Sequence, residues 1–200
     1  MDTAVHLLVG EELTPPETKG YTVSVLSAYL WAVGVARDKG VYSEEEYQTA
    51  IRETKELVDN FQTVIEESEA WYDRNRASIV NSDRLFVLGY GIDYGSMLEG
   101  MLKVGEMLRL PTIGYEIEEY SHGPTMALKP NQTLFMIGSD EAEFERMLQF
   151  SGRIQESIPT GVHVITCRGD RGRQPGSGVW DQGQQIYRAL MYTVPFQFVA

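Results

Sequence analysis

Four uninterrupted apolar runs limit the folds open to this 200-residue chain. They are LFVLGY at 85–90, TIGYEI at 112–117, TLFMIG at 133–138 and VHVITC at 162–167. Each run has the length of a strand, and helical patterns lie between them over about 94–108 and 140–156. Continuous apolar strands that alternate with helices indicate a parallel sheet covered on both faces. The sequence therefore predicts an α/β fold, a three-layer αβα sandwich around a central parallel, flavodoxin-like sheet, with ligands at the carboxyl ends of the strands.

The two ends of the chain add elements outside this alternation. Residues 4–9, AVHLLV, predict a short buried strand, and the apolar stretch 21–36 follows a loop that two prolines interrupt. Ser43, a good N-cap, is followed by three glutamates and begins a charged helical pattern. After Cys167 a Gly/Arg-rich loop leads to a short edge strand within 177–181 and to a final helix from near Gln184.

The charge of the chain restricts its partners. The formal net charge is -12, with a sequence pI near 4.7. Nucleic acids and anionic lipids need Lys or Arg to neutralise their phosphates, so neither is an expected partner. A phosphate on a small ligand is not excluded, because backbone N–H groups at a helix start bind one with little help from side chains.

The cysteine and histidine content indicates in which cellular compartment the protein works and whether it binds a metal or cofactor. Only one cysteine is present, no charged and then apolar leader opens the chain, and no apolar run approaches the roughly 20 residues of a membrane span. We expect a cytoplasmic protein with no membrane role. His6, His122 and His163 lie far apart without the spacing of a metal site, so we predict no metal and no cofactor.

A glycine-containing loop follows the first of the four runs. It reads GYGIDYGS from Gly89 to Ser96 and opens a helix, whose unpaired N–H groups are suited to an oxyanion. The loop has neither the spacing of a dinucleotide-binding motif nor that of a P-loop. A tight strand-to-helix turn without any ligand explains the same residues.

The helix after this loop carries a polar row. Ser96, Glu99, Lys103 and Glu106 are spaced by 3, 4 and 3 residues, which places them on one face over about three turns. A solvated helix face would show the same spacing. The next segment, EEYSHGP at 118–124, places His122 just past a strand end. Histidine transfers protons near neutral pH, so a carboxylate such as Glu106 and this histidine form a chemically sensible pair.

Three segments together resemble the sugar isomerase (SIS) family. They are LGYGIDYGSMLEGMLKVGEML, EIEEYSHGPTMAL and the closing YTVPFQFVA, and their order and separation match the second SIS domain of double-domain enzymes related to glucosamine-6-phosphate synthase and fructosamine-6-phosphate deglycases. PPETKGYTVSVL resembles the stretch that closes the first SIS domain. The resemblance implies that 1–40 are the last strand and helix of an otherwise missing first domain. It makes 41–80 a linking helical segment and 81–200 a second domain without its C-terminal tail.

The resemblance also implies roles for individual residues. The glutamate that matches Glu106 moves a proton between sugar carbons 1 and 2, and the histidine that matches His122 assists ring opening. Lys103 matches a lysine near the developing enolate. The expected substrate-binding residues are Thr18, Lys19, Gly91, Ser96 and Glu99, of which Glu99 orients its neighbours or packs the helix.

The function implied is that of a phosphosugar isomerase or deglycase-type enzyme, or its catalytic half, acting on a small sugar phosphate. Because the family's histidine enters the active site across a subunit boundary, a homodimer with a shared site is expected. A non-catalytic sugar-phosphate-binding regulator is the main alternative, and a generic flavodoxin-like scaffold is the third interpretation. Retention of both Glu106 and His122 favours the enzyme.

Overall fold

A computed structural model describes residues 4–13, 16–139, 141–166, 178–179 and 185–200. The chain divides into two units, Met1–Asn60 and Phe61–Ala200. The long helix α2, Glu44–Val80, contributes its first part to one unit and its second part to the other. The linking helical segment predicted from the sequence is therefore one continuous helix of 37 residues.

The first unit is a helical hairpin. Helix α1, Lys19–Asp38, is joined to α2 by a short turn that ends at Ser43. Ser43 caps α2 as predicted: its N–H donates to Glu46 Oε2 at 2.7 Å, and its hydroxyl accepts from the Glu46 N–H at 3.2 Å. The Arg37 guanidinium lies 4.3 Å from the centre of the Tyr47 ring and links the two helices.

The strand expected at residues 4–9 does not form. This segment has no regular secondary structure, and Val5, Leu7 and Leu8 are 46%, 41% and 92% exposed. A strand needs a neighbouring strand to pair its backbone groups, and the described residues of the first unit include none. An apolar run alone was therefore an insufficient signal for a strand.

The second unit is built on the predicted parallel sheet. Its strands are β1 (Arg84–Gly89), β2 (Thr112–Glu116), β3 (Gln132–Ile137), β4 (Gly161–Thr166) and β5 (Gly178–Val179). They pair in the order β2-β1-β3-β4-β5, and every pairing is parallel. The chain first moves from β1 to β2 and then returns past β1 to β3. This reversal gives the flavodoxin-like order and places a switch point between β1 and β3.

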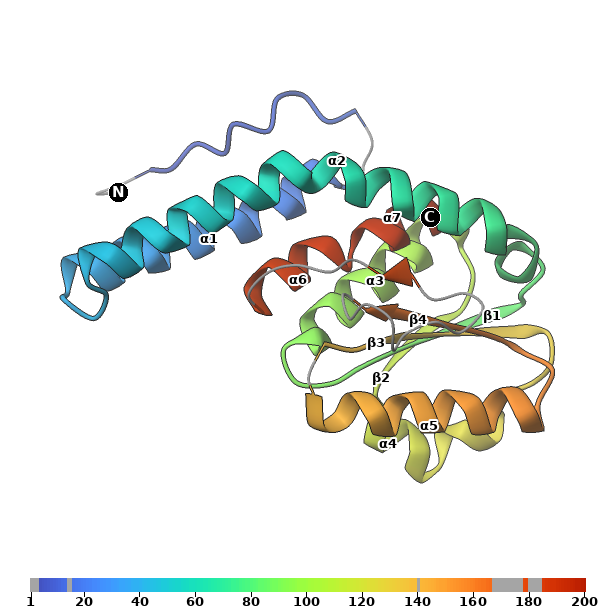
Figure 1. Cartoon of the computed structure of the whole chain (residues 1–200). Coiled ribbons are helices and arrows are strands. Elements are labelled where there is room, and N and C mark those ends of the chain that lie inside the picture. The colour runs from blue at the N-terminus through green and yellow to red at the C-terminus, as the bar shows by residue number, and fades with distance from the viewer. Residues whose placement is uncertain (1–3, 14–15, 140, 167–177, 180–184) are drawn as a thin grey trace. The chain divides into compact units, whose positions relative to one another are not determined.

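Helices cover both faces of the sheet, which confirms the three-layer sandwich (Figure 1). One layer holds α3 (Asp93–Leu108), α6 (Gln185–Met191), α7 (Val194–Val199) and the second part of α2. The other holds α4 (Ile117–His122), a short 3-10 turn (Pro124–Ala127) and α5 (Glu141–Ser157). The single C-terminal helix predicted from the sequence is divided into α6 and α7, because Pro195 cannot donate a helical hydrogen bond and begins a new helix instead.

The sheet is buried from both sides. Toward α5, Phe86 and Leu134 pack with Tyr120, Phe144 and Met147. On the opposite face Phe196 of α7 lies against α3 so closely that a Cβ on Gly100 would stand 2.7 Å from its ring. This close contact fixes the position of α3, the helix that carries half of the predicted site residues.

Candidate active site

The loop between β1 and α3 is cross-linked to the loop after β3. Asp93, in the first turn of α3, accepts hydrogen bonds through Oδ2 from the Ser139 N–H at 2.9 Å and the Ser139 hydroxyl at 2.5 Å. Arg188 of α6 donates to the Ser139 carbonyl at 2.9 Å. Gly91 provides the turn with a φ of 53°, a conformation that side chains disfavour. The switch point of the sheet is thus held by side chains from three segments.

The buried carboxylate of Asp93 makes it less favourable for an oxyanion to bind at the loop between β1 and α3. Asp93 is 1% exposed and already places a carboxylate at the positive end of α3, so a second anion there would meet like charge. Ser96 is also 1% exposed, and its hydroxyl makes no hydrogen bond within the described part of the chain. The roles of Gly91 and Ser96 as ligand-binding residues stay predictions.

The polar row on α3 runs from the interior to the surface. Lys103 and Glu99 form a salt bridge with 3.5 Å between Nζ and Oε1, and their side chains are only 7% and 13% exposed. Glu106, one turn further, is exposed. The solvated-face alternative is therefore wrong for Lys103 and Glu99, because their heads are withdrawn from water and neutralise one another.

A second row on α3 is apolar and exposed. Tyr94, Leu98 and Leu102 follow one another at intervals of four residues and are 41%, 43% and 50% exposed. Continuing the same spacing by one step leads to Glu106. The carboxylate predicted to be catalytic therefore lies at the end of an uncovered apolar row.

His122 is the last residue of α4, a helix that the sequence analysis did not predict. Glu116, at the end of β2, caps this helix: its Oε2 accepts from the N–H groups of Glu118 at 2.7 Å and Glu119 at 3.1 Å. The signal for α4 was an acidic residue after the strand followed by two more in the first helical turn.

His122 lines an open pocket of about 450 Å3. The pocket lies where β2 ends and α3 begins, and its other lining residues are Tyr94, Gly114, Tyr115, Glu116, Glu119, Gly123 and Pro124. This position, at the carboxyl edge of a parallel sheet, is the one that the fold class predicts. The sequence-based interpretation identified His122 but assigned no role to Tyr94, Glu116 or Glu119.

Glu106 does not line this pocket. Tyr94 does, and Glu106 follows it by 12 residues along α3, which is about 18 Å at 1.5 Å per residue. The helix runs away from the carboxyl edge of the sheet, so its last turn lies toward the opposite edge. A single copy of the chain therefore does not bring Glu106 and His122 together in this pocket.

Thr18 and Lys19 lie in the first unit, at the start of α1. The N–H groups of both residues, together with that of Gly20, donate to the carboxylate of Glu12 at 2.7, 2.9 and 3.0 Å. The backbone hydrogen bond from Lys19, then those from Thr18 and Gly20, lower the pKa of Glu12. The donors expected near a sugar phosphate thus hold an internal carboxylate, and their role toward a ligand stays a prediction.

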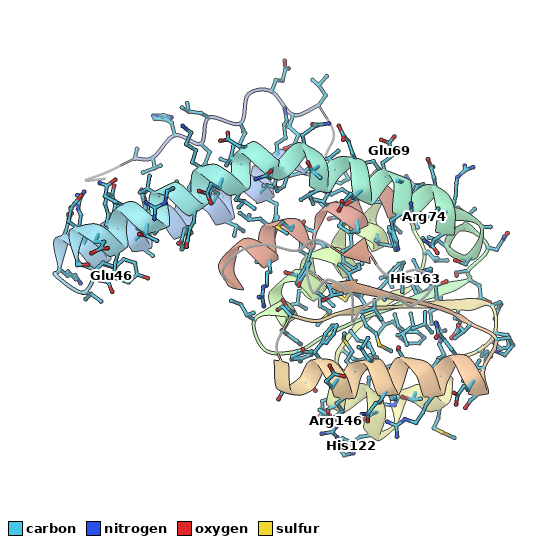
Figure 2. All side chains as sticks on the ribbon, viewed as in Figure 1. Glu46, Glu69, Arg74, His122, Arg146 and His163 are labelled. Atoms are coloured by element: carbon cyan, nitrogen blue, oxygen red, sulfur yellow. The ribbon has the colours of Figure 1, made fainter. Side chains whose placement is uncertain are left out.

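His163 is a buried histidine whose pKa departs from its ordinary value. It lies on β4 in the interior (Figure 2), 3% exposed, stacked on Phe135 with ring centres 5.4 Å apart and edge-on to Trp71 at 5.6 Å. Its Nε2 lies 3.3 Å from the Ser78 hydroxyl. Burial lowers the pKa of His163 to about 4, so the ring is neutral near pH 7.

Within the described ranges, no three His, Cys, Asp or Glu side chains are placed so that they could bind a metal ion. The helices of the same ranges include none with the length and apolar character that a membrane crossing requires.

Comparison with known proteins places the chain in a family. No protein-family model matches the sequence. A glutamine–fructose-6-phosphate aminotransferase (isomerizing) from Caldanaerobacter subterraneus is 30% identical over 165 residues, which is 82% of this chain and 26% of the relative. A suspected phosphosugar isomerase from Clostridium difficile 630 is 28% identical and superposes with a TM-score of 0.86, over 99% of this chain and 55% of its own. The chain carries a sugar isomerase (SIS) domain.

The fold of the SIS domain recurs in a further solved structure. The C-terminal domain of glucosamine-fructose-6-phosphate aminotransferase from Francisella tularensis superposes with a TM-score of 0.71 at 16% identity, over 92% of this chain and 52% of its own. This similarity extends to the fold alone. The chain spans about a quarter to a third of the length of its curated relatives.

Proposed function

We propose that this chain is a phosphosugar isomerase or deglycase-type enzyme, or its catalytic half. It moves a proton between C1 and C2 of a ring-opened ketose or amino-ketose 6-phosphate. The observation that carries the proposal is the presence of an accessible histidine in a pocket at the carboxyl edge of an SIS sheet. The names of the relatives support it, because they include an isomerizing aminotransferase of fructose 6-phosphate.

In this proposal Glu106 is the base that takes the proton from the sugar carbon and returns it to the neighbouring carbon. Lys103 stabilises the negative charge that develops on the enolate oxygen. Its salt bridge to Glu99 supports this role, since the bridge holds the ammonium group in one place on the polar row of α3. His122 protonates the ring oxygen during ring opening.

We propose further that two copies of the chain share each active site. The separation of Glu106 from the His122 pocket within one copy supports this arrangement, because the two groups then meet only across a boundary between subunits. The apolar row of Tyr94, Leu98 and Leu102 supports it as well, since such a row costs free energy while it faces water. Replacing Leu98 with Glu should then shift the protein toward monomer in light scattering, and a wild-type protein that is monomeric at high concentration would contradict the proposal.

The organisation of the chain and its location are also part of the proposal. Residues 1–40 correspond to the end of a first SIS domain and 81–200 to a second, with 41–80 as the link between them. The enzyme is cytoplasmic and binds neither nucleic acid nor membrane. Its net charge of -12 and its single cysteine support these statements.

Solvent deuterium exchange tests the proposed chemistry. Fructose 6-phosphate or an amino-ketose 6-phosphate is incubated with the protein in D2O, and deuterium at C1 and C2 is followed by NMR. Glu106→Gln should slow the exchange by about 10²- to 10⁴-fold, because the substitution removes the base but keeps the shape. Glu143→Gln, an exposed carboxylate on α5, is the matched control. Binding of sugar phosphate without any exchange in the wild type would instead support the regulatory alternative.

A further inference from the structure

The pocket beside His122 has an unusual charge for a site in a phosphosugar enzyme. Two carboxylates, Glu116 and Glu119, line it, and the described residues of its lining include neither lysine nor arginine. Phosphate groups in proteins are held by Arg, Lys or clustered N–H donors, whereas this lining supplies mainly acceptors. The pocket is thus poorly suited to the phosphate end of a substrate.

Glu116 presents a carboxylate that is already oriented. Its Oε2 accepts both capping hydrogen bonds of α4, at 2.7 and 3.1 Å, while Oε1 makes no hydrogen bond within the described part of the chain. Because the cap fixes the side chain before any ligand arrives, binding at Oε1 loses little rotamer entropy. The second carboxylate, Glu119, lies on the first turn of the same helix.

Arg146 forms a salt bridge with α4, but it does not neutralise this pocket. Arg146 of α5 bonds Glu118 at 2.6 Å, and Glu118 does not belong to the lining. Glu118 and Glu119 are neighbours in sequence, so their side chains leave the helix about 100° apart. The guanidinium is therefore committed to the side of α4 that carries Glu118.

Besides His122 and Pro124, the remaining described lining consists of two tyrosines and two glycines. Tyr94 and Tyr115 offer ring faces that attract cations. Gly114 contributes only backbone to the lining, because a Cβ there would stand 2.4 Å from the sulfur of the buried Met97. Carboxylates and aromatic rings around an open space of about 450 Å3 match a protonated amine on a sugar-sized ligand.

We infer that this pocket binds the protonated amine of an amino-ketose phosphate, with Glu119 and Oε1 of Glu116 as acceptors. The phosphate of the same substrate binds elsewhere. The inference rests on the proposed function and narrows it, because it selects amino-ketose phosphates over simple ketose phosphates. The amine group then lies next to His122, at the end of the substrate where the proton transfer takes place.

The test compares a cationic ligand with its neutral counterpart. Binding of 1-amino-1-deoxyfructose and of fructose to the protein is followed by NMR chemical shifts near pH 7 in about 0.15 M salt, where distant charges are screened. The amine should bind more tightly than fructose. Glu119→Gln should weaken amine binding by about two- to fivefold, as expected for an accessible ion pair, and leave fructose unchanged. Glu118→Gln removes the same charge one residue away and should change neither.

Several results would overturn the inference. These are equal or absent binding of the two sugars, equal effects of the Glu118 and Glu119 variants, and displacement of the amine by inorganic phosphate from the same residues. The deuterium exchange assay reports separately on the proposed function. An amine preference in a protein whose exchange ignores Glu106→Gln would sink the function alone, while normal exchange without that preference would sink the inference alone.

Discussion

His122 and His163 show how differently one residue type is used within the same unit. His122 ends a short helix and lies exposed in an open pocket, whereas His163 points from a central strand into an aromatic interior. The two are labelled at the surface and in the interior in Figure 2. Burial lowers the pKa of the interior ring, that of His163.

This difference warns against reading a perturbed pKa as a sign of function. Burial shifts the pKa of His163, yet its contacts are Trp71, Phe135 and the Ser78 hydroxyl, which form a packed core. His122 instead has the accessible position, in the lining of the open pocket. Accessibility at the carboxyl edge of the sheet is thus the better guide to the active site.

The largest expected effect separates the two histidines by activity. His122→Gln should slow turnover of the sugar phosphate by about 10³-fold, since the amide cannot transfer a proton. The free energy of unfolding of the His122→Gln variant should stay within about 0.5 kcal/mol of wild type, because the side chain is exposed. Steady-state kinetics together with urea denaturation measure both quantities. Full activity of this variant would remove His122 from the mechanism.

His163→Ala should give the opposite result. Loss of a buried ring between two aromatic side chains leaves a cavity, and we expect a destabilisation of about 3 kcal/mol. Activity per folded molecule should be unchanged. Urea denaturation followed by tryptophan fluorescence gives the stability, with His122→Gln as the matched comparison. A variant that is stable but inactive would contradict the structural role.

The pH dependence of stability should also differ between variants of His163 and variants of His122. The folded pKa of His163 is about 4, below the ordinary 6.5, so the unfolded chain binds the proton more readily. Its contribution is complete above about pH 6.5 and is lost as the pH falls through about 4. Between pH 7 and pH 5 the free energy of unfolding should fall by about 2 kcal/mol from this group alone. His163→Phe should lack this part of the decrease and His122→Gln should keep it, and an equal slope in both variants would refute the assignment.

The smallest effect concerns the hydroxyl beside the buried ring. Ser78→Ala removes the polar neighbour of His163 Nε2, and we expect a loss of about 1 kcal/mol. Ser82→Ala, a hydroxyl one turn further along the chain, provides a comparison that does not involve His163. Unchanged stability together with an unchanged pH dependence would show that the ring gains nothing from the hydroxyl.

Most of the second unit was predictable because its signals are local. The strand runs and α3 lie within about a residue of their predicted bounds, since continuous apolar segments and helical spacing report directly on burial. Residues 4–9 gave the same signal and formed no strand, because pairing depends on partners that one segment cannot reveal. The break before Pro195 was visible in the sequence but was not used.

The site was less predictable because it depends on contacts between segments. Nothing in the spacing of Ser96, Lys103 and Glu106 shows that the first two are buried and the third exposed. That difference comes from the packing of α6 and α7 on α3. Likewise, Tyr94 and Glu119 join His122 only because β2 returns the chain to the start of α3.

The position of β2 at one end of the sheet has a consequence for aggregation. Within the described residues it pairs only with β1, so its other edge is open to strands from other molecules. That edge is five residues long, Pro111 precedes it, and α4 begins immediately after it. A foreign strand therefore finds a short template that ends abruptly on both sides. The helix that carries His122 thereby also helps to keep the protein from polymerising through its sheet.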